Sequence, residues 1–209
     1  MGYGLTLAAA LLALGAQAPL TIIELPAARK TGGLPLMEAL SRRATSRAFD
    51  TRRLPPEQLS NLLWAAFGVN RPDGKRTAPS SRDRQEIEIY VLLEQGAYVY
   101  DAPHHLLTPV LAGDIRALGG RQDFVRDAPL TLVFVADLAK MGEGNAVEKE
   151  STAAIDTGFI SQNVYLYCAS EGLATGVRAW VDTEALGKRL TLRADQRITA
   201  AQSVGYPKK

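Results

Sequence analysis

The densest group of chemically capable side chains lies in residues 41–53. Five arginines and four hydroxyl residues fall in this stretch, where a predicted helix gives way to an extended segment. Guanidinium groups and hydroxyls together suit a phosphate dianion, because charge-assisted hydrogen bonds to phosphate oxygens are strong. Cations near a helix C-terminus also interact favourably with the helix dipole and need no ligand, so both interpretations stay open. A nucleic-acid contact is less favoured, since aromatic residues do not alternate with the arginines.

A second polar segment, residues 76–86, stands before a predicted strand. Ser80 and Ser81 follow a proline here, and small hydroxyl residues let the backbone approach a flat ligand closely. Asp83 and Gln85 supply polar groups suited to the edge of a heterocycle. Further polar groups gather at three places: residues 161–163, 170–175 and 204–209.

The charge balance and the scarcity of cysteine and histidine exclude several classes of site. The chain has 24 basic and 22 acidic residues, and a net charge of +2 does not predict a nucleic-acid partner. One cysteine, Cys168, excludes a disulfide within the chain and any multi-cysteine metal site, and it is expected to be an inert core thiol. The two histidines, His104 and His105, are adjacent, so on a strand they would point to opposite faces. No metal site is predicted.

Residues 1–18 carry no charged side chain and combine a short apolar run with a small-x-small triplet before Pro19. This pattern predicts a secretory signal peptide, although the usual basic residue near its start is missing. We therefore expect an exported, periplasmic protein, or a cytoplasmic one if the segment is not a signal. Residues 19–34 are expected to form an extended lead-in, and residues 35–209 a single domain. No later segment is apolar over the length of a membrane helix, so no membrane span is predicted.

Hydrophobic periodicity predicts an α+β fold with a mixed sheet flanked by helices. Helices are expected at residues 35–43, 57–67, 147–171 and 183–190. Strands are expected at residues 86–94, 97–101, 106–111, 130–136, 173–181 and 198–206. The first two strands predict an antiparallel hairpin. The strand, long helix and strand of the second half predict a parallel crossover.

The predicted long helix, residues 147–171, is apolar or small on every face. A helix with this pattern is expected to be buried on all sides. In a domain of this size we expect a second subunit to cover one side of the helix, at a dimer interface. A central helix within a monomer is the alternative.

Taken together, these segments resemble the nitroreductase family of flavoproteins, and the resemblance runs from about residue 36 to residue 207. The arginine segment resembles the family's opening motif, and residues 62–68 and 77–81 resemble its next landmarks. Residues 170–173 and 204–207 complete the order. Among subgroups, the chain is similar to short members related to the dehydrogenases that oxidise azoline rings in peptide natural products.

This resemblance implies that residues 35–209 form an FMN-binding domain, with two FMN sites at the interface of a homodimer. It also implies hydride transfer at flavin N5 in a ping-pong cycle. Arg43 and Thr45 match phosphate-binding positions, and Ala44 matches a position that contacts the flavin through its backbone. Arg47 matches the basic residue beside flavin N1 and O2, where a fixed cation stabilises the negative charge of reduced flavin.

The polar loop matches a second part of the implied FMN site. Ser80 and Ser81 match the loop that reaches the flavin, often from the partner subunit, and Asp83 and Gln85 follow in the same loop. Asp83 stands where the family often has Asn. A carboxylate cannot donate a hydrogen bond unless it is protonated, so this departure affects the contact with the flavin edge or the redox potential.

Two C-terminal segments complete the implied FMN site. Arg178, Ala179 and Trp180 fall near the backbone that faces flavin N5. Lys208 or Lys209, just beyond the last predicted strand, would complete the phosphate site.

The expected activity is that of an FMN-dependent oxidoreductase. It would pass electrons from a small-molecule donor, such as NAD(P)H, to an organic acceptor such as a nitroaromatic or a quinone. The chain offers no obvious acid or base, so no catalytic side chain is assigned and the cofactor would carry the chemistry. The alternatives are a non-catalytic flavin-binding carrier on the same fold, a dehydrogenase of an exported substrate, and a dimeric scaffold without a ligand.

Overall fold

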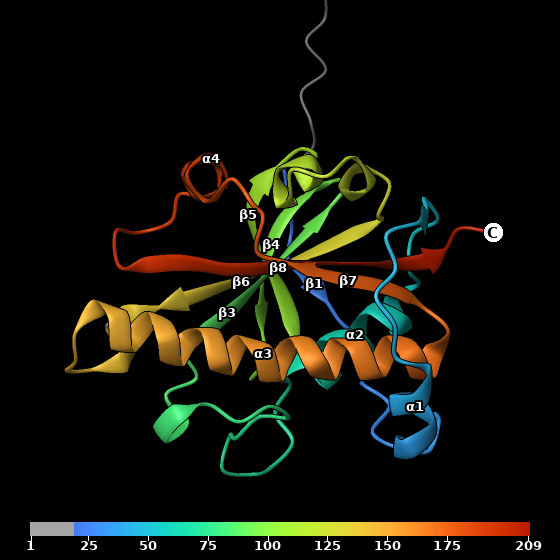
Figure 1. The fold of residues 1–209 in the computed structure, drawn as a ribbon, viewed down its shortest axis with the longest axis horizontal. Helices are drawn as coiled ribbons and strands as arrows, with labels where there is room; N and C mark the ends of the chain where they lie inside the picture. Colours follow the sequence, from blue (N-terminus) through green and yellow to red (C-terminus); the bar gives the residue numbers. More distant parts are fainter. Residues whose placement is uncertain (1–18) are drawn as a thin grey trace, which may run out of the picture.

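The computed structural model describes residues 19–209, which fold around an eight-stranded sheet (Figure 1). The strands follow the order β1-β5-β4-β3-β6-β8-β2, and β7 pairs with β8 off this path. Their bounds are Ile23–Glu24 (β1), Phe49–Asp50 (β2), Ile87–Leu93 (β3), Gly96–Asp101 (β4), Leu106–Ala112 (β5), Leu130–Asp137 (β6), Ala174–Arg178 (β7) and Gln196–Pro207 (β8). The predicted signal segment, residues 1–18, lies outside the described residues.

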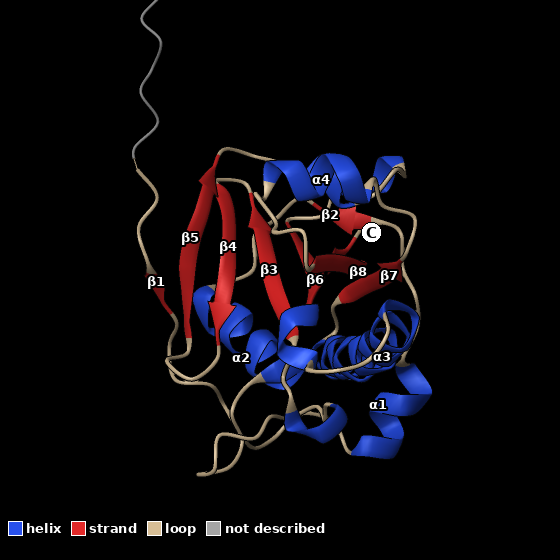
Figure 2. Cartoon of the chain, turned by 90° about the vertical axis from the view of Figure 1, so that its left-hand side faces the viewer, coloured by secondary structure: helices blue, strands red, loops and turns tan. Residues whose placement is uncertain are grey.

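Helices cover both faces of this sheet. Their bounds are Leu36–Arg42 (α1), Pro56–Phe67 (α2), Ala146–Glu171 (α3) and Thr183–Arg189 (α4). Figure 2 shows α3 and α4 on opposite sides of β8. Alternate side chains of a strand point to opposite faces, so Ile89 and Val91 join the core under α2 and α3, whereas Tyr90 and Leu92 join the core under α4. The predicted α+β architecture is confirmed.

The predicted crossover is present, but its two strands are not neighbours. The long helix α3 connects β6 to β7, and both strands pair with β8 in the antiparallel sense. They therefore run parallel to each other with β8 between them. Every pairing among the described strands is antiparallel. The reason is that β8, the last strand of the chain, lies between β6 and β7, which a direct crossover would have made parallel neighbours.

One side of α3 is exposed in the single chain. The helix begins after Asn145, whose side chain accepts a hydrogen bond from a first-turn amide at 2.9 Å, and it ends at Gly172 in the left-handed conformation. Ile160 on the inner side is fully buried, whereas Ile155 and Phe159 are 58% and 44% exposed. The alternative of a central helix buried within a monomer is therefore wrong, because the sheet covers only the inner side of the helix, and burial of the outer side by a second subunit stays a prediction.

Two short strands escaped prediction, and both tie a loop to the sheet. β1, in the predicted lead-in, pairs with β5 through Ile23 and Leu107. β2 pairs with the end of β8 through Phe49 and Pro207. Each is only two residues long, so neither produces a readable periodicity. β2 has the larger consequence, because it fixes the arginine segment against the C-terminal end of β8.

Candidate functional site

The arginine segment lies against the ends of β7 and β8. Ser46 N donates a hydrogen bond to Thr175 O at 2.9 Å, and Lys208 N donates to Ala48 O at 3.3 Å. These backbone bonds continue the pairing of β2 with β8. Residues 43–48 and Lys208, which are far apart in the sequence, are therefore side by side in the fold.

Tyr165 of α3 contacts this segment and holds two of its residues in place. Its hydroxyl accepts a hydrogen bond from Val177 N at 3.1 Å and lies 2.9 Å from Thr45 Oγ1, to which it can donate. The guanidinium carbon of Arg43 lies 5.3 Å from the centroid of the same ring, within the range of a cation–π interaction. One buried tyrosine thus orients two of the residues that the sequence assigns to phosphate binding.

Gly176 of β7 allows the arginine segment to approach the sheet. A Cβ atom at this position would lie 2.9 Å from Ser46 O, closer than side-chain carbons pack. Because that neighbour is a backbone atom, it cannot simply rotate away. The absence of a side chain at Gly176 is therefore what lets the segment lie this close to β7.

The five arginines of residues 41–53 divide into two groups. Arg42 and Arg53 each pair with a glutamate, and the guanidinium carbon of Arg52 lies 3.7 Å from the centroid of a tyrosine ring. Within residues 19–209, no carboxylate lies within ion-pairing distance of Arg43, Arg47 or Arg52, although Arg43, like Arg52, lies over a tyrosine ring. Arg42 occupies the last turn of α1 and Arg43 is its C-cap residue. The helix dipole therefore accounts for these two arginines but not for Arg47, and an anionic ligand is the interpretation that covers Arg47 as well.

The loop of residues 80–85 contacts a different part of α3. Ser81 N donates a hydrogen bond to Asp156 Oδ2 at 2.8 Å. Asp156 and Tyr165 are nine positions apart on one helix, which places them about 14 Å apart along its axis. Figure 1 shows the green loops of residues 71–86 below the middle of α3 and the light-blue chain after α1 near its right-hand end. The two predicted halves of the site are therefore not brought together within one chain.

Hydrogen bonds within the loop occupy the polar groups predicted to meet a heterocycle. Gln85 Nε2 donates to Asp83 Oδ1 at 3.1 Å, and Gln85 Oε1 accepts from Arg76 Nε at 2.7 Å. The Gln85 backbone N–H donates to Ser80 Oγ at 3.0 Å. Arg82, Asp83 and Gln85 all adopt positive φ angles, an uncommon conformation for residues other than glycine. The side chain of Gln85 therefore braces this loop, and Ser81 and the exposed Asp83 remain at its surface.

At the end of β7, the side chain of Arg178 turns into the protein. Its Nε donates to Gly119 O at 2.7 Å, and its Nη1 donates to Gly176 O at 3.3 Å. Burial lowers the pKa of Arg178 to about 10. Ala179 and Trp180, which follow, are both exposed. Arg178 can therefore offer a ligand its backbone but not its guanidinium, while the side chains of Ala179 and Trp180 are exposed.

The comparison with known proteins identifies the family. Residues 40–206 match the model of the Nitroreductase family. The chain belongs to the nitroreductase family. A protein described as a nitroreductase from Methanocaldococcus jannaschii is 30% identical over 162 residues, which cover 72% of this chain and 82% of that protein. A crystal structure described as a nitroreductase from Ralstonia eutropha JMP134 is 43% identical, with a TM-score of 0.86 and coverage of 90% of each chain.

A more distant structure shares the fold. The NADPH:FMN oxidoreductase of Vibrio harveyi, solved with NAD+, is 19% identical, with a TM-score of 0.63. The match covers 83% of this chain and 69% of that one. At this identity, the likeness shows a common nitroreductase fold and no more.

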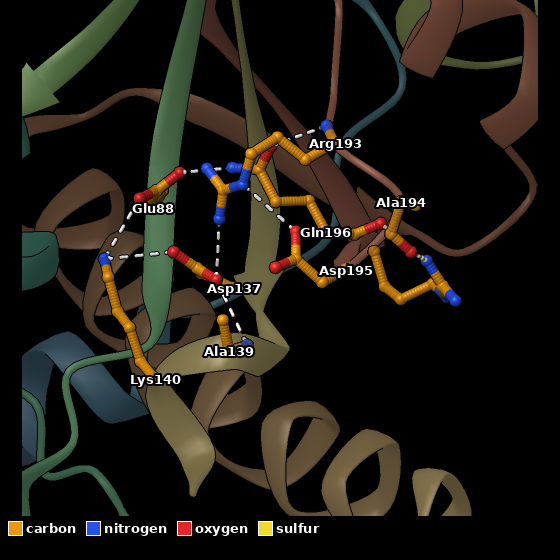
Figure 3. Close-up of polar contacts among 9 residues, drawn as sticks. Glu88, Asp137, Ala139, Lys140, Arg193, Ala194, Asp195 and Gln196 are labelled. Carbon is orange, nitrogen blue, oxygen red and sulfur yellow. Dashed lines mark hydrogen bonds and ion pairs between the residues drawn. The ribbon is translucent and has the colours of Figure 1, made fainter.

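A second polar cluster lies at the start of β8 (Figure 3). Lys140 Nζ lies 3.0 Å from Glu88 Oε1, and Arg193 Nη2 lies 2.8 Å from Asp137 Oδ1. Gln196 Nε2 donates to Glu88 Oε2 at 2.8 Å. These contacts join β3, the end of β6 and the start of β8. Because each carboxylate here pairs with a cation, no unpaired charge is left in this cluster to attract a ligand.

Sequence reasoning did not single out two buried residues that hold the candidate site. Tyr165 and Asp156 were seen only as parts of a long helix, although both are polar groups on its buried side. Buried polar groups usually have a specific hydrogen-bond partner, and both of these bond to predicted site segments. A polar residue at a core position of a long apolar helix is the signal that could have identified them.

The remaining reactive groups are held in protein contacts. His105 lies between the hydroxyls of Ser60 and Tyr100, at 2.7 and 2.9 Å from its Nε2 and Nδ1. Cys168 is buried, and burial raises the pKa of its thiol. In the described part of the chain, no three His, Cys, Asp or Glu residues are grouped to hold a metal ion, and no helix is long and apolar enough to cross a membrane.

Proposed function

We propose that two copies of this chain form a homodimer that binds FMN at two interface sites and works as an FMN-dependent oxidoreductase. The observation that carries this proposal is that Arg43 and Arg47 stand on one short segment, which also holds Thr45 and lies beside Lys208, and that no carboxylate in residues 19–209 neutralises these two arginines. The phosphate of FMN supplies the matching charge. The fold shared with an NADPH:FMN oxidoreductase supports the choice of this cofactor.

The residues at this position fit a flavin phosphate. Arg43 is oriented by the Tyr165 ring, and the Thr45 hydroxyl is held by the Tyr165 hydroxyl. Ala44 and Arg47 are exposed on the same segment. A preorganised set of guanidinium and hydroxyl donors binds an anion without first losing much conformational freedom.

Each part of the chain would then have a separate task. When bound, FMN would supply hydride transfer at its N5 atom. Arg43, Thr45 and Lys208 would bind the phosphate, and Arg47 would stabilise negative charge at the pyrimidine edge of the ring. The end of β7, with the exposed Trp180, would line the face where electron donor and acceptor alternate. We assign no acid or base to the chain.

The exposed side of α3 supports a dimeric arrangement. Phe159 lies on this side, close to the middle of the helical stretch between Asp156 and Tyr165. A two-fold axis near this point would pack the α3 helices of two chains antiparallel. The partner's loop that follows its Ser80 would then lie opposite the Arg43 segment, so that each FMN site would be completed by both chains.

Titration of the purified full chain with FMN, together with its mass in solution, tests this proposal. We expect a dimer that takes up FMN and acquires a flavin spectrum. We also expect the bound flavin to be reduced by a donor and reoxidised by a quinone or a nitroaromatic. A monomer that stays colourless after FMN addition refutes the proposal.

A non-catalytic flavin carrier is the second candidate function, and Asp83 is the residue that favours it. Its carboxylate accepts a hydrogen bond from Gln85 Nε2 and, when ionised, has no proton to donate to a flavin edge. Tight FMN binding without any turnover of quinones or nitroaromatics would support this candidate over the oxidoreductase.

We also propose that residues 1–18 direct export to the periplasm, which bears on the electron donor. NAD(P)H is chiefly a cytoplasmic reductant, so an exported enzyme would take electrons from another donor or would oxidise an exported substrate as a dehydrogenase. Stopped-flow mixing of the FMN-loaded protein with NADPH tests this. A fast, saturable reduction would show that NADPH is a competent donor and would contradict this part of the proposal.

A further inference from the structure

A pair of buried carboxyl groups lies directly beneath the Ser80–Ser81 loop. Glu86, which ends this loop, is 0% exposed, and Asp156 of α3 is 3% exposed. Asp156 Oδ2 accepts the hydrogen bond from Ser81 N at 2.8 Å. Within the described residues, neither carboxylate oxygen of Glu86 has a hydrogen-bond donor.

Asp156 is the neighbouring carboxyl group that acts on Glu86, both through its charge and through its side chain as a hydrogen-bond partner. Two ionised carboxylates in such a place would repel each other, and a buried carboxylate without a donor is costly. Burial and the neighbouring Asp156 raise the pKa of Glu86 to about 7, against the opposing charge of Arg84 from its own loop. A single proton between Glu86 and Asp156 removes the repulsion and satisfies an otherwise orphaned oxygen.

We propose that Glu86 is a positioning residue, which carries a proton and donates it in a hydrogen bond to Asp156, thereby fixing Asp156 as the acceptor for the Ser81 amide. Under the proposed function, on which this inference rests, Ser81 belongs to the loop that reaches FMN. The positive φ angles of Arg82 and Asp83 give this loop an uncommon backbone conformation, which needs such a restraint. Loss of the proton would place two like charges in contact and would release the loop.

The direction of the pH effect follows from the raised pKa. Because the folded chain holds the Glu86 proton more tightly than the unfolded chain, the stabilisation is complete below pH 4.5, the ordinary pKa. It is lost as the pH rises toward and through about 7. FMN affinity should weaken over the same rise, since Ser81 loses its fixed acceptor.

Dissociation constants for FMN in the wild type and two Glu86 variants test the role of the proton. Glu86→Gln keeps a donor at every pH, so the ratio of the wild-type constant to the variant constant should rise on the order of tenfold between about pH 6 and about pH 8.5. Glu86→Leu has no donor and should bind FMN weakly at both values. Glu88→Gln, on the same strand, is the matched control and should keep the wild-type profile. A ratio that does not change with pH would overturn the inference.

Infrared spectroscopy tests the shared proton without any flavin. At about pH 6, the wild type and Glu88→Gln should show the carbonyl band of a buried carboxylic acid, and Glu86→Gln should lack it. The protection factor of the Ser81 amide, which corrects for the base catalysis of exchange itself, should be larger in the wild type at this pH than at about pH 8.5. A chain that binds no FMN but shows the band would refute the proposed function and leave the proton in place. A wild type without the band would refute the shared proton itself.

Discussion

The two ends of β8 carry opposite arrangements of charge. At its first residue, Gln196, two carboxylates meet a lysine and an arginine, and each charge has a partner (Figure 3). Beyond its last residue, Pro207, lie Arg43 and Arg47, which no carboxylate of the described chain neutralises. The same strand therefore joins a region whose charges serve the fold to a region whose charges are available to an anion.

The difference indicates where stability and binding are separable. Paired charges cost the fold little free energy, because each charge is neutralised by its partner. Neighbouring cations without an anion repel each other, and a bound phosphate would remove that repulsion. Substitutions at the two ends of β8 should therefore affect different measurements.

The largest effect is expected from Arg43→Ala combined with Arg47→Ala. Loss of both guanidinium groups should weaken FMN binding by about a hundredfold or more, because each removes charge-assisted bonds. Thermal unfolding with and without FMN measures the effect, since the wild type should gain stability from the ligand and the variant should not. Arg42→Ala, which removes an arginine already paired with Glu38, is the control. Equal FMN affinity in the double variant and the control would contradict the assignment of the unpaired arginines to FMN binding.

The next effect is expected at the opposite end of β8, from Asp137→Ala. This change removes the partner of Arg193 and the acceptor of the Ala139 amide, and should lower the free energy of unfolding by about 2 kcal/mol. FMN affinity should not change. Urea denaturation followed by FMN titration checks both statements. Glu184→Ala, which removes an exposed ion pair with Lys188, should leave stability nearly unaltered.

Tyr165→Phe should have an intermediate effect that sharpens the comparison. The hydroxyl satisfies Val177 N and orients Thr45, so its loss should cost about 1 kcal/mol of stability and weaken FMN binding about tenfold. Tyr167→Phe removes another α3 hydroxyl, which donates to Gln58 O, and should reduce stability alone. If both variants lower FMN affinity equally, Tyr165 has no special place in the site.

The smallest effect is expected from Lys208→Ala. The backbone of Lys208 bonds to Ala48, but its exposed side chain is free to move, so FMN affinity should fall by only about threefold. Lys209→Ala should change nothing. Isothermal titration of the two variants assigns the phosphate contact to one lysine, and a larger loss in Lys209→Ala would reverse the assignment.

Local patterns in the sequence predicted most of the helices and strands, because periodicity reports which face of an element is buried. The ends of α2 and α3 lie within one residue of the predicted ones. Periodicity does not report which strands pair, so the insertion of β8 between β6 and β7 was not foreseen. It also cannot distinguish a face buried by the same chain from one left open to a partner, as on α3.

The site was predicted in its residues more than in its contacts. The charge of Arg43 and Arg47 and the hydroxyl of Thr45 follow from residue type, and the fold brings Arg43 and Thr45 together at Tyr165. The contacts of Gln85 and Arg178 did not follow, because an amide or a guanidinium can bond to the protein as readily as to a ligand. Whether such a group bonds to the protein or to a ligand depends on which backbone groups the fold places around it.

The separation of Asp156 and Tyr165 along α3 has a consequence for mixtures of chains. If each FMN site takes its arginine segment from one protomer and its serine loop from the other, two differently damaged chains can repair each other. A mixed dimer of one chain lacking Arg43 and Arg47 with another chain whose loop is disrupted would place both defects in one site and leave the second intact. An isolated mixed dimer of two inactive variants would then recover up to half the flavin content of a normal dimer, a form of complementation that a self-contained monomer cannot show.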